Sequence, residues 1–185
     1  MERFDLKDAK RKFLSIYNEK SSNETALTMA IKSALGRNQT YSKKRKVTES
    51  ERTEFRKEWK RLLEELAKKY QKSCSEEVFM KDVVELKETI NNKFGDFFEN
   101  KFRISHAQKS IAVYLKHLWC LNEISEPPIC PVDRTILEKV NAPEKLKAWT
   151  KVDDIKTYND QLKVLKDKAG KESLASWEIK TFQNK

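Results

Sequence analysis

The sequence predicts an all-α protein, and three observations carry that prediction. Three glycines and four prolines are the only strong chain breakers in 185 residues, and so few of them suit helices better than a sandwich or barrel of short strands. Apolar residues recur at intervals of three and four, which is the period of an amphipathic helix. Residues that favour helix N-termini precede several of these stretches. We expect residues 1–185 to form a single compact domain of about eight to ten helices.

The first two helices are predicted from residues 3–19 and 24–35. Residues 3–19 mix apolar side chains with charges, as in an amphipathic surface helix. Residues 21–23, Ser-Ser-Asn, break this helix and cap the next one. Residues 24–35 are apolar nearly all round. They predict a central buried helix that ends at Gly36.

Residues 36–47, GRNQTYSKKRKV, form a polar connection with four consecutive basic residues, Lys43, Lys44, Arg45 and Lys46. Such a run is typical of a loop that contacts phosphates or of a nuclear-localisation tract. A solvated loop has the same composition. The sequence therefore predicts a basic loop here and leaves its role open.

Two longer helical stretches follow the basic loop. Thr48 and Glu51 have the spacing of a capping box, which predicts a helix that runs to about Tyr70. Residues 73–77 break this helix and cap the next. The apolar pattern within residues 78–90 predicts one or two further helices.

Residues 101–140 are the candidate functional core, because they hold the longest apolar helix and three of the four prolines. Ser105, followed three residues later by Gln108, has the pattern of a capping box, so a helix should start at His106 and run to about Asn122. Its apolar residues fall on one broad face. The opposite stripe is expected to meet water or a ligand, and it consists of His106, Lys109, Ser110, Lys116 and His117.

A proline-rich segment leads from this helix to a second helix start. Residues 126–128, Glu-Pro-Pro, force an extended chain, and Pro131 fixes the next turn. Asp133 is well placed as the N-cap of a helix that begins at Arg134. Two helix N-termini, one with Lys109 in its first turn and one capped by Asp133, should then face a common opening. Three further helices are expected: a short one that starts within residues 141–144 and is closed by Trp149, one that is capped by Thr150 or Asp153 and stops at Gly170, and a last one that begins at Ser173 and docks onto the body of the protein.

The charge of the chain points to a polyanionic partner. Lys and Arg number 39 against 29 Asp and Glu, which gives a formal charge of +10 and a pI near 9.4. Nucleic acid is the first candidate for such a partner. A lysine-rich protein with no such partner would have the same composition. The N-terminus lacks the pattern of a signal peptide, and no apolar run approaches the ~20 residues of a membrane span. We therefore expect a cytoplasmic protein without a membrane partner.

The cysteines do not indicate a disulfide framework or a metal site. Cys74, Cys120 and Cys130 are odd in number and widely spaced, so we expect reduced thiols. Together with His106 and His117 they lack the short ligand spacings that preorganise a zinc site. No metal is expected.

Two short motifs resemble those of a known enzyme family. Gln108-Lys109-Ser110 opens a helix rich in apolar residues, and Pro131-Val132-Asp133-Arg134-Thr135-Ile136 starts another. This order resembles the helix-hairpin-helix DNA glycosylases, the superfamily of endonuclease III and 8-oxoguanine glycosylase. In that family a lysine opens the second hairpin helix, and an aspartate after a Pro-Val or similar pair caps a later helix. The family's hairpin glycines are missing here, and the interval of 24 residues from Lys109 to Asp133 exceeds the family's common spacing.

The resemblance implies a function and a set of site residues. Lys109 would attack the deoxyribose C1′ as a Schiff-base nucleophile, and Asp133 would assist deprotonation and stabilise the cationic sugar. The substrate would be double-stranded DNA with a damaged, extrahelical base, and a bacterial protein of this kind would associate with the nucleoid. No cofactor is expected, since the four-cysteine cluster of the endonuclease III branch is absent, and a monomer is favoured. The residues expected to contact DNA are His106, Gln108, Ser110, Lys116, Arg134, Lys43, Lys44, Arg45 and Lys46.

Each of these residues also has a purely structural interpretation. Lys109 can be an ordinary surface lysine, and Asp133 can be a plain N-cap. Two other functions therefore compete with the glycosylase: a non-catalytic helical module that binds nucleic acid, and an interaction protein whose positive charge is incidental.

Overall fold

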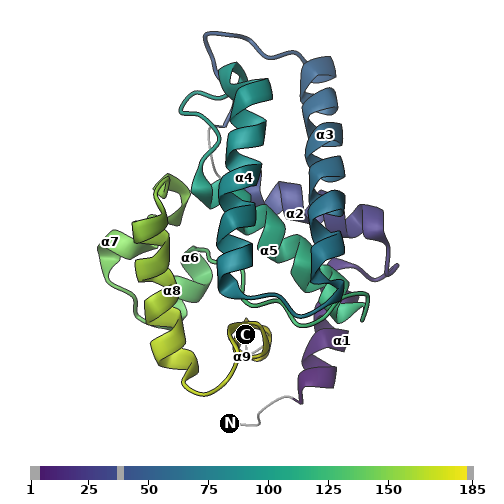
Figure 1. Ribbon diagram of the computed structural model, residues 1–185, viewed down its shortest axis with the longest axis vertical. Coiled ribbons are helices and arrows are strands. Elements are labelled where there is room, and N and C mark those ends of the chain that lie inside the picture. Colours follow the sequence, from purple (N-terminus) through teal and green to yellow (C-terminus); the bar gives the residue numbers. More distant parts are fainter. Residues whose placement is uncertain (1–4, 37–39, 183–185) are drawn as a thin grey trace.

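Helix α5, Ile104–Cys120, runs through the middle of the molecule, and every one of its residues except Val113 is buried. Helix α2 crosses it on one side, and the long helices α3 and α4 cover it on the other (Figure 1). The computed structural model describes residues 5–36 and 40–182. The predicted start of the first helix at residue 3 lies outside the described residues.

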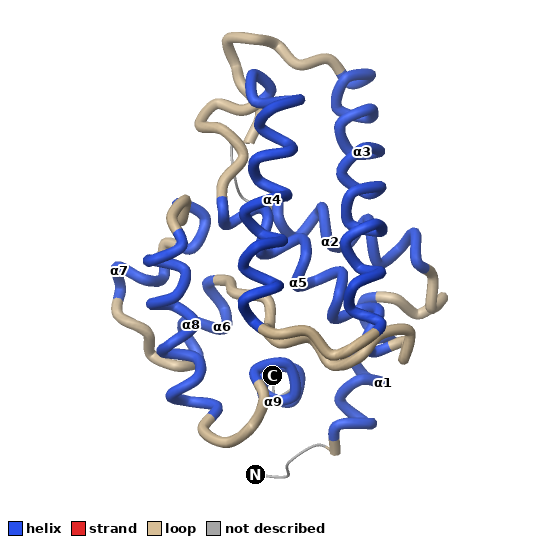
Figure 2. Tube along the Cα trace, viewed as in Figure 1, coloured by secondary structure: helices blue, strands red, loops and turns tan. Residues whose placement is uncertain are grey.

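The all-α prediction is confirmed, and Figure 2 shows helices joined by loops throughout the described chain. Within that part, the only β structure is an isolated antiparallel bridge between Tyr41 and Phe98. Nine α-helices are present among the described residues, together with three short 3-10 helices. The α-helices are α1 Leu6–Tyr17, α2 Asn23–Leu35, α3 Glu49–Ala67, α4 Glu76–Phe94, α5 Ile104–Cys120, α6 Arg134–Lys139, α7 Glu144–Lys147, α8 Ile155–Ala169 and α9 Leu174–Phe182; the 3-10 helices are η1 Lys68–Gln71, η2 Gly95–Phe97 and η3 Trp149–Lys151.

The predicted capping box at the start of α3 is confirmed. Thr48 Oγ1 accepts a hydrogen bond from the backbone N–H of Glu51 at 3.3 Å, and Glu51 Oε2 accepts one from the backbone N–H of Thr48 at 2.8 Å. Both bonds satisfy N–H groups that have no partner inside the helix. Glu51 also pairs with Arg45, so the cap ties the basic loop to α3.

We expect Thr48→Ala to lower the free energy of unfolding by about 1 kcal/mol, because the variant loses an N-cap oxygen. Urea unfolding at neutral pH would measure this difference. Thr53→Ala, on an exposed turn of the same helix, is the matched control and should change stability by no more than about 0.5 kcal/mol. Equal losses in both variants would show that the cap itself contributes nothing.

Two predictions about the central helices are wrong. Helix α2 is not buried all round: it packs Ala30 and its other alanines against α5 but exposes Glu24, Thr28 and Lys32. Helix α5 is the central helix instead, since segments that are distant in the sequence cover every side of it.

Helix α5 also begins two residues earlier than predicted. Its N-cap is Arg103, whose backbone N–H donates to Nδ1 of His106 at 3.1 Å. The predicted capping box of Ser105 and Gln108 does not form. The expected cap, Ser105, donates its hydroxyl to the carbonyl of Thr150 at 3.1 Å. Asp153 Oδ1 accepts from the backbone N–H of Ile104 at 3.2 Å. A segment almost fifty residues away thus fixes this helix start, and Lys109 lies in the second turn rather than the first.

Helix α9 closes the fold beneath α5, between α1 and α8 (Figure 1). It buries Ile179 and Ala175 against Phe13 of α1 and Trp119 of α5. The docking of a last helix that starts after Ser173 is therefore confirmed. The three cysteines are unpaired, and none of the described helices is long and apolar enough to cross a membrane.

Candidate functional site

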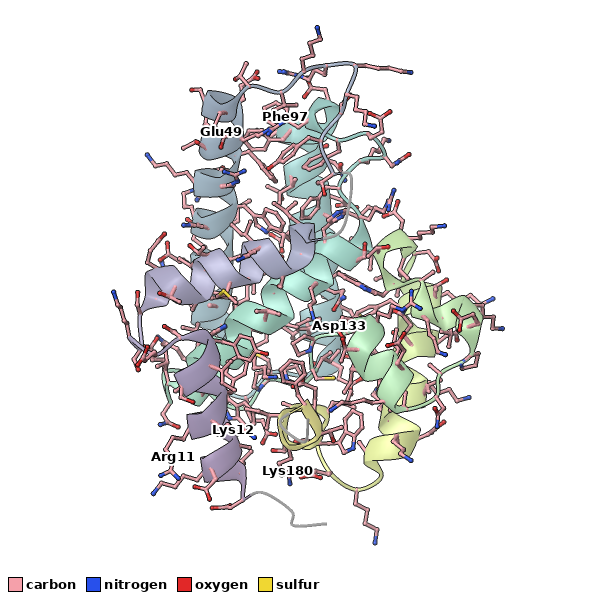
Figure 3. All side chains as sticks on the ribbon, turned by 180° about the vertical axis from the view of Figure 1, so that it is seen from behind. Arg11, Lys12, Glu49, Phe97, Asp133 and Lys180 are labelled. Atoms are coloured by element: carbon pink, nitrogen blue, oxygen red, sulfur yellow. The ribbon has the colours of Figure 1, made fainter. Side chains whose placement is uncertain are left out.

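The structure brings Lys109 and Asp133 into direct contact. Lys109 Nζ lies 2.5 Å from Asp133 Oδ2, and the two side chains are 8% and 24% exposed. Asp133 Oδ1 accepts the backbone N–H of Ile136 at 3.0 Å, so Asp133 is the N-cap of α6, as predicted. Figure 3 shows Asp133 at the start of this helix, beside α5.

Gln108 sets the register that makes this contact possible. Its side-chain amide donates to the carbonyl of Val132 at 2.8 Å and accepts the backbone N–H of Val132 at 3.3 Å. The two bonds hold the segment before α6 against α5. On each segment the bonded residue directly precedes a residue of the ion pair. Gln108 is 2% exposed, and its amide is used within the protein, whereas its contact with DNA stays a prediction.

The ion pair lies on the wall of a cavity of about 310 Å³, which we call the Lys–Asp pocket. This volume lies at the lower end of the range for small-ligand pockets. Helices α1, α2, α5, α6 and α9 all contribute to the lining. Its aromatic residues are Phe13, Tyr17, Trp149 and Phe182, its exposed basic residues are Lys32 and Arg134, and its buried charged residues include Lys116 and Glu178.

No protein-family model, curated protein or solved structure matches this chain. The glycosylase resemblance therefore rests on the sequence motifs alone. Within the described chain, no group of three or more His, Cys, Asp or Glu side chains could hold a metal ion.

Sequence reasoning missed several residues of this pocket. Tyr17 and Lys32 come from helices that precede the candidate core by about seventy residues or more. Trp149 reaches the pocket from η3, with its ring centroid 5.8 Å from Lys109 Nζ. No local motif marks these residues, because their place depends on how the helices pack.

The ion pair controls the protonation of Asp133. Burial alone would raise the pKa of this carboxyl, but the Lys109 ammonium and the N–H of Ile136 outweigh burial and hold the pKa below its usual value. Asp133 is thus a carboxylate at neutral pH. This carboxylate can compensate a positive charge that forms in the pocket.

The lowered pKa predicts a pH-dependent contribution to stability. The contribution is present above the ordinary Asp pKa of about 3.9 and is lost as the pH falls through the lower pKa of the folded state. We expect Asp133→Asn to be less stable than the wild type at pH 7, with a difference that shrinks towards pH ~3. Urea unfolding of both proteins at several pH values would measure it. A difference that stays constant with pH would contradict the pKa shift.

The polar stripe of α5 that was expected to meet water or a ligand is buried, and this prediction is wrong. Ser110 is fully buried and accepts the indole N–H of Trp59 at 3.2 Å. His106 is 3% exposed and stacks on Phe102 at 5.1 Å between ring centroids. His117 is 1% exposed and lies 4.8 Å from the Phe13 ring. In this conformation neither Ser110 nor His106 lies on the surface, as a duplex contact would require.

Lys116 is likewise enclosed. Its Nζ lies 2.9 and 2.7 Å from the two carboxylate oxygens of Glu178, and both side chains are under 8% exposed. The ammonium also lies 4.5 Å from the ring centroid of Phe13 and 4.8 Å from that of Phe182. This ion pair joins α5 to α9 at the Lys–Asp pocket, and the contact of Lys116 with DNA stays a prediction.

The basic loop lies away from the Lys–Asp pocket. Arg45 pairs with Glu51 and Asp96 and stacks over the ring of Phe97. Figure 3 places Phe97 and Glu49 at one end of the molecule, far along it from Asp133. Residues 37–39 of the loop lie outside the described residues. Lys43, Lys44 and Lys46 are exposed, as is Arg134, which pairs with Glu138, and their contacts with nucleic acid stay predictions.

Proposed function

We propose that this protein is a DNA glycosylase with lyase activity at abasic sites, and that the Lys–Asp pocket receives the damaged nucleotide. The observation that carries the proposal is the contact between Lys109 Nζ and Asp133 Oδ2 on the wall of this pocket. An amine and a carboxylate in contact are the two groups that Schiff-base chemistry at a sugar carbon needs. The aromatic residues of the lining suit a flipped base, which is read by stacking and by hydrogen bonds.

The chemistry begins with a proton transfer within the ion pair. Asp133 accepts a proton from the Lys109 ammonium, and the free amine then attacks C1′ of the nucleotide. The C1′–N bond breaks, and the base leaves with the bonding electrons and takes the proton that Asp133 accepted, so Asp133 is again a carboxylate and stabilises the positive charge that develops on the sugar. The new secondary ammonium gives a proton to O4′ as the C1′–O4′ bond opens, which leaves a protonated Schiff base. Loss of a C2′ proton then breaks the C3′–O bond, and the 3′ phosphate leaves with the bonding electrons.

The charge distribution supports a nucleic-acid substrate. The chain carries a formal charge of +10, and Lys32 and Arg134 are exposed basic residues at the Lys–Asp pocket. Phosphates on either side of an extruded nucleotide would meet such residues. If they do, the logarithm of the binding constant should fall linearly with the logarithm of the salt concentration, with a slope of about −0.9 for each neutralised phosphate.

The test is covalent trapping. Labelled duplexes with 8-oxoguanine, uracil, an alkylated base or an abasic site are incubated with the protein, and borohydride reduces any Schiff base to a stable amine. We expect a covalent complex with at least one duplex, and its identity would name the substrate class. No complex and no base release with any duplex would overturn the proposal.

A non-catalytic nucleic-acid-binding module is the second candidate. The observation that favours it is that the ion pair is complete within the protein, since Asp133 uses one oxygen for the cap of α6 and the other for Lys109. Salt-sensitive binding to duplexes without any trapped complex would identify this function.

A further inference from the structure

A groove of about 690 Å³ lies in the angle between α2 and α3, and we call it the α2–α3 groove. Lys60 of α3 closes one end of it, since its ammonium contacts both Glu24 and Thr28 of α2. From there the two helices diverge, and Figure 3 shows α2 passing in front of α3 on this side of the molecule. The other end of the groove lies between Leu35 on α2 and Thr53 on α3.

The floor of the groove is apolar. Leu27, Ile31 and Leu35 lie one turn apart on the same face of α2. Leu27 is 2% exposed and Ile31 is 4% exposed, whereas Leu35 is only partly buried. The protein therefore covers this stripe less and less towards the C-terminal end of α2. The methylene stems of the basic side chains on the rim extend the apolar surface.

The rim of the groove is basic. Its basic residues are Lys32 from α2 and Arg56, Lys57 and Lys60 from α3. The one acid of the lining, Glu24, is already paired with Lys60. Within the part of the chain that the structure describes, Lys32 and Lys57 form no ion pair. Both are exposed, so an occupant of the groove meets a positive charge from each of the two helices.

We propose that the α2–α3 groove binds an acidic amphipathic helix of a partner protein. The exposed rim leaves the groove open to solvent along its side, whereas a pocket for a small ligand encloses most of the ligand surface. The groove follows α2 from Glu24 to Leu35, which is roughly 17 Å, or three helical turns. A helix of this length lays apolar side chains on the floor at intervals of three and four residues, and its flanking acids meet Lys32 and Lys57.

A peptide titration followed by NMR tests the proposal. The probe is a synthetic helical peptide of about 14 residues, with leucine on one face and glutamate on both flanks. In a protein with ¹³C-labelled isoleucine methyl groups, we expect the signal of Ile31 to shift and to saturate. Ile179, buried between α9 and α1, is the internal reference. A matched peptide with lysine in place of glutamate should not bind. No shift of Ile31, or equal binding of the two peptides, would overturn the proposal.

Charge reversal at exposed positions tests the rim without disturbing the core. The double variant Lys32→Glu/Lys57→Glu should bind the acidic peptide about tenfold more weakly or worse, because two attractions become repulsions. It should also gain affinity for the lysine peptide. The matched control, Lys145→Glu/Lys171→Glu, reverses two exposed lysines elsewhere and should bind both peptides as the wild type does. Equal affinities in the two double variants would contradict the site.

The apolar floor is tested at Leu35, the least covered residue of the stripe. Leu35→Gln should weaken binding of the acidic peptide, because it removes apolar contact and keeps the charges of the rim. The control is Ile16→Gln, since Ile16 is 57% exposed on α1. Both variants are compared where urea unfolding shows them folded. Wild-type affinity in Leu35→Gln would show that charge alone attracts the peptide and that the groove is not its site.

A short lesion-free duplex is the competing occupant of the basic rim. A shift of Ile31 with the duplex but not with the acidic peptide would assign the groove to nucleic acid and overturn the proposal. A saturating shift with the acidic peptide supports it, whether or not the duplex competes. The proposal goes beyond the chemistry of the Lys–Asp pocket, and none of these outcomes changes if covalent trapping at Lys109 fails.

Discussion

Lys109→Arg should lose at least roughly 10³-fold in single-turnover base release and give no trapped complex, while its affinity for a lesion-free duplex stays close to that of the wild type. Arginine keeps the positive charge and the ion pair with Asp133, so binding that depends on charge is preserved. Its guanidinium stays protonated in proteins and cannot act as an amine nucleophile. The variant therefore separates the charge of Lys109 from its chemistry.

The matched control for this variant is Lys32→Arg, because Lys32 is an exposed lysine of the same pocket. It should retain base release and trapping. Urea unfolding of both variants shows whether the longer side chain is accommodated beside Asp133. Wild-type turnover in folded Lys109→Arg would remove Lys109 from the proposed mechanism.

Helix starts were predictable where the cap lies within a few residues of the helix. Thr48 with Glu51, and Asp133 with the N–H of Ile136, bond across three residues, so their pattern is visible in the sequence. The start of α5 was not predictable in this way. Its first two backbone N–H groups donate to the carbonyl of Val152 and to the side chain of Asp153. No residue close to Ile104 in the sequence indicates these partners.

The polar stripe of α5 shows a second limit of sequence reasoning. A helical pattern separates apolar from polar residues, and the usual inference is that the polar ones meet water. Ser110 accepts a hydrogen bond from Trp59, which lies 51 residues away in the sequence. Lys116 forms an ion pair with Glu178, which lies 62 residues away. A buried polar residue with a protein partner cannot be told from an exposed one until the partner's position is known.

The sequence predicts that Lys109 and Asp133 lie at two helix N-termini that face a common opening, and the structure shows the two side chains in contact. The hydrogen bonds between Gln108 and Val132 that hold them in register are not predictable from the motifs, which mark Gln108 as a residue that contacts DNA. The two residues of the ion pair can thus be picked out from the sequence. The scaffold that aligns it was accessible only from the structure.

The second large effect concerns the buried pair of Lys116 and Glu178. We expect Glu178→Gln to lower the free energy of unfolding by about 3–5 kcal/mol, because it leaves a buried ammonium without its counter-charge. The rings of Phe13 and Phe182 near Lys116 Nζ compensate only part of this loss. Urea unfolding at neutral pH would measure the change. A loss below about 1 kcal/mol would show that Lys116 finds water or another partner.

The double variant Lys116→Met/Glu178→Leu tests whether this ion pair serves the Lys–Asp pocket or only the docking of α9 onto α5. Replacing both charges with apolar residues of similar size should restore most of the stability that Glu178→Gln loses, since buried pairs seldom stabilise more than well-packed apolar side chains. Stability alone then gives no reason for two charges in this position. Because both residues line the Lys–Asp pocket, we expect the restored double variant to be impaired in base release or in substrate affinity. Full activity in a stable double variant would instead assign the pair to the docking of α9 onto α5.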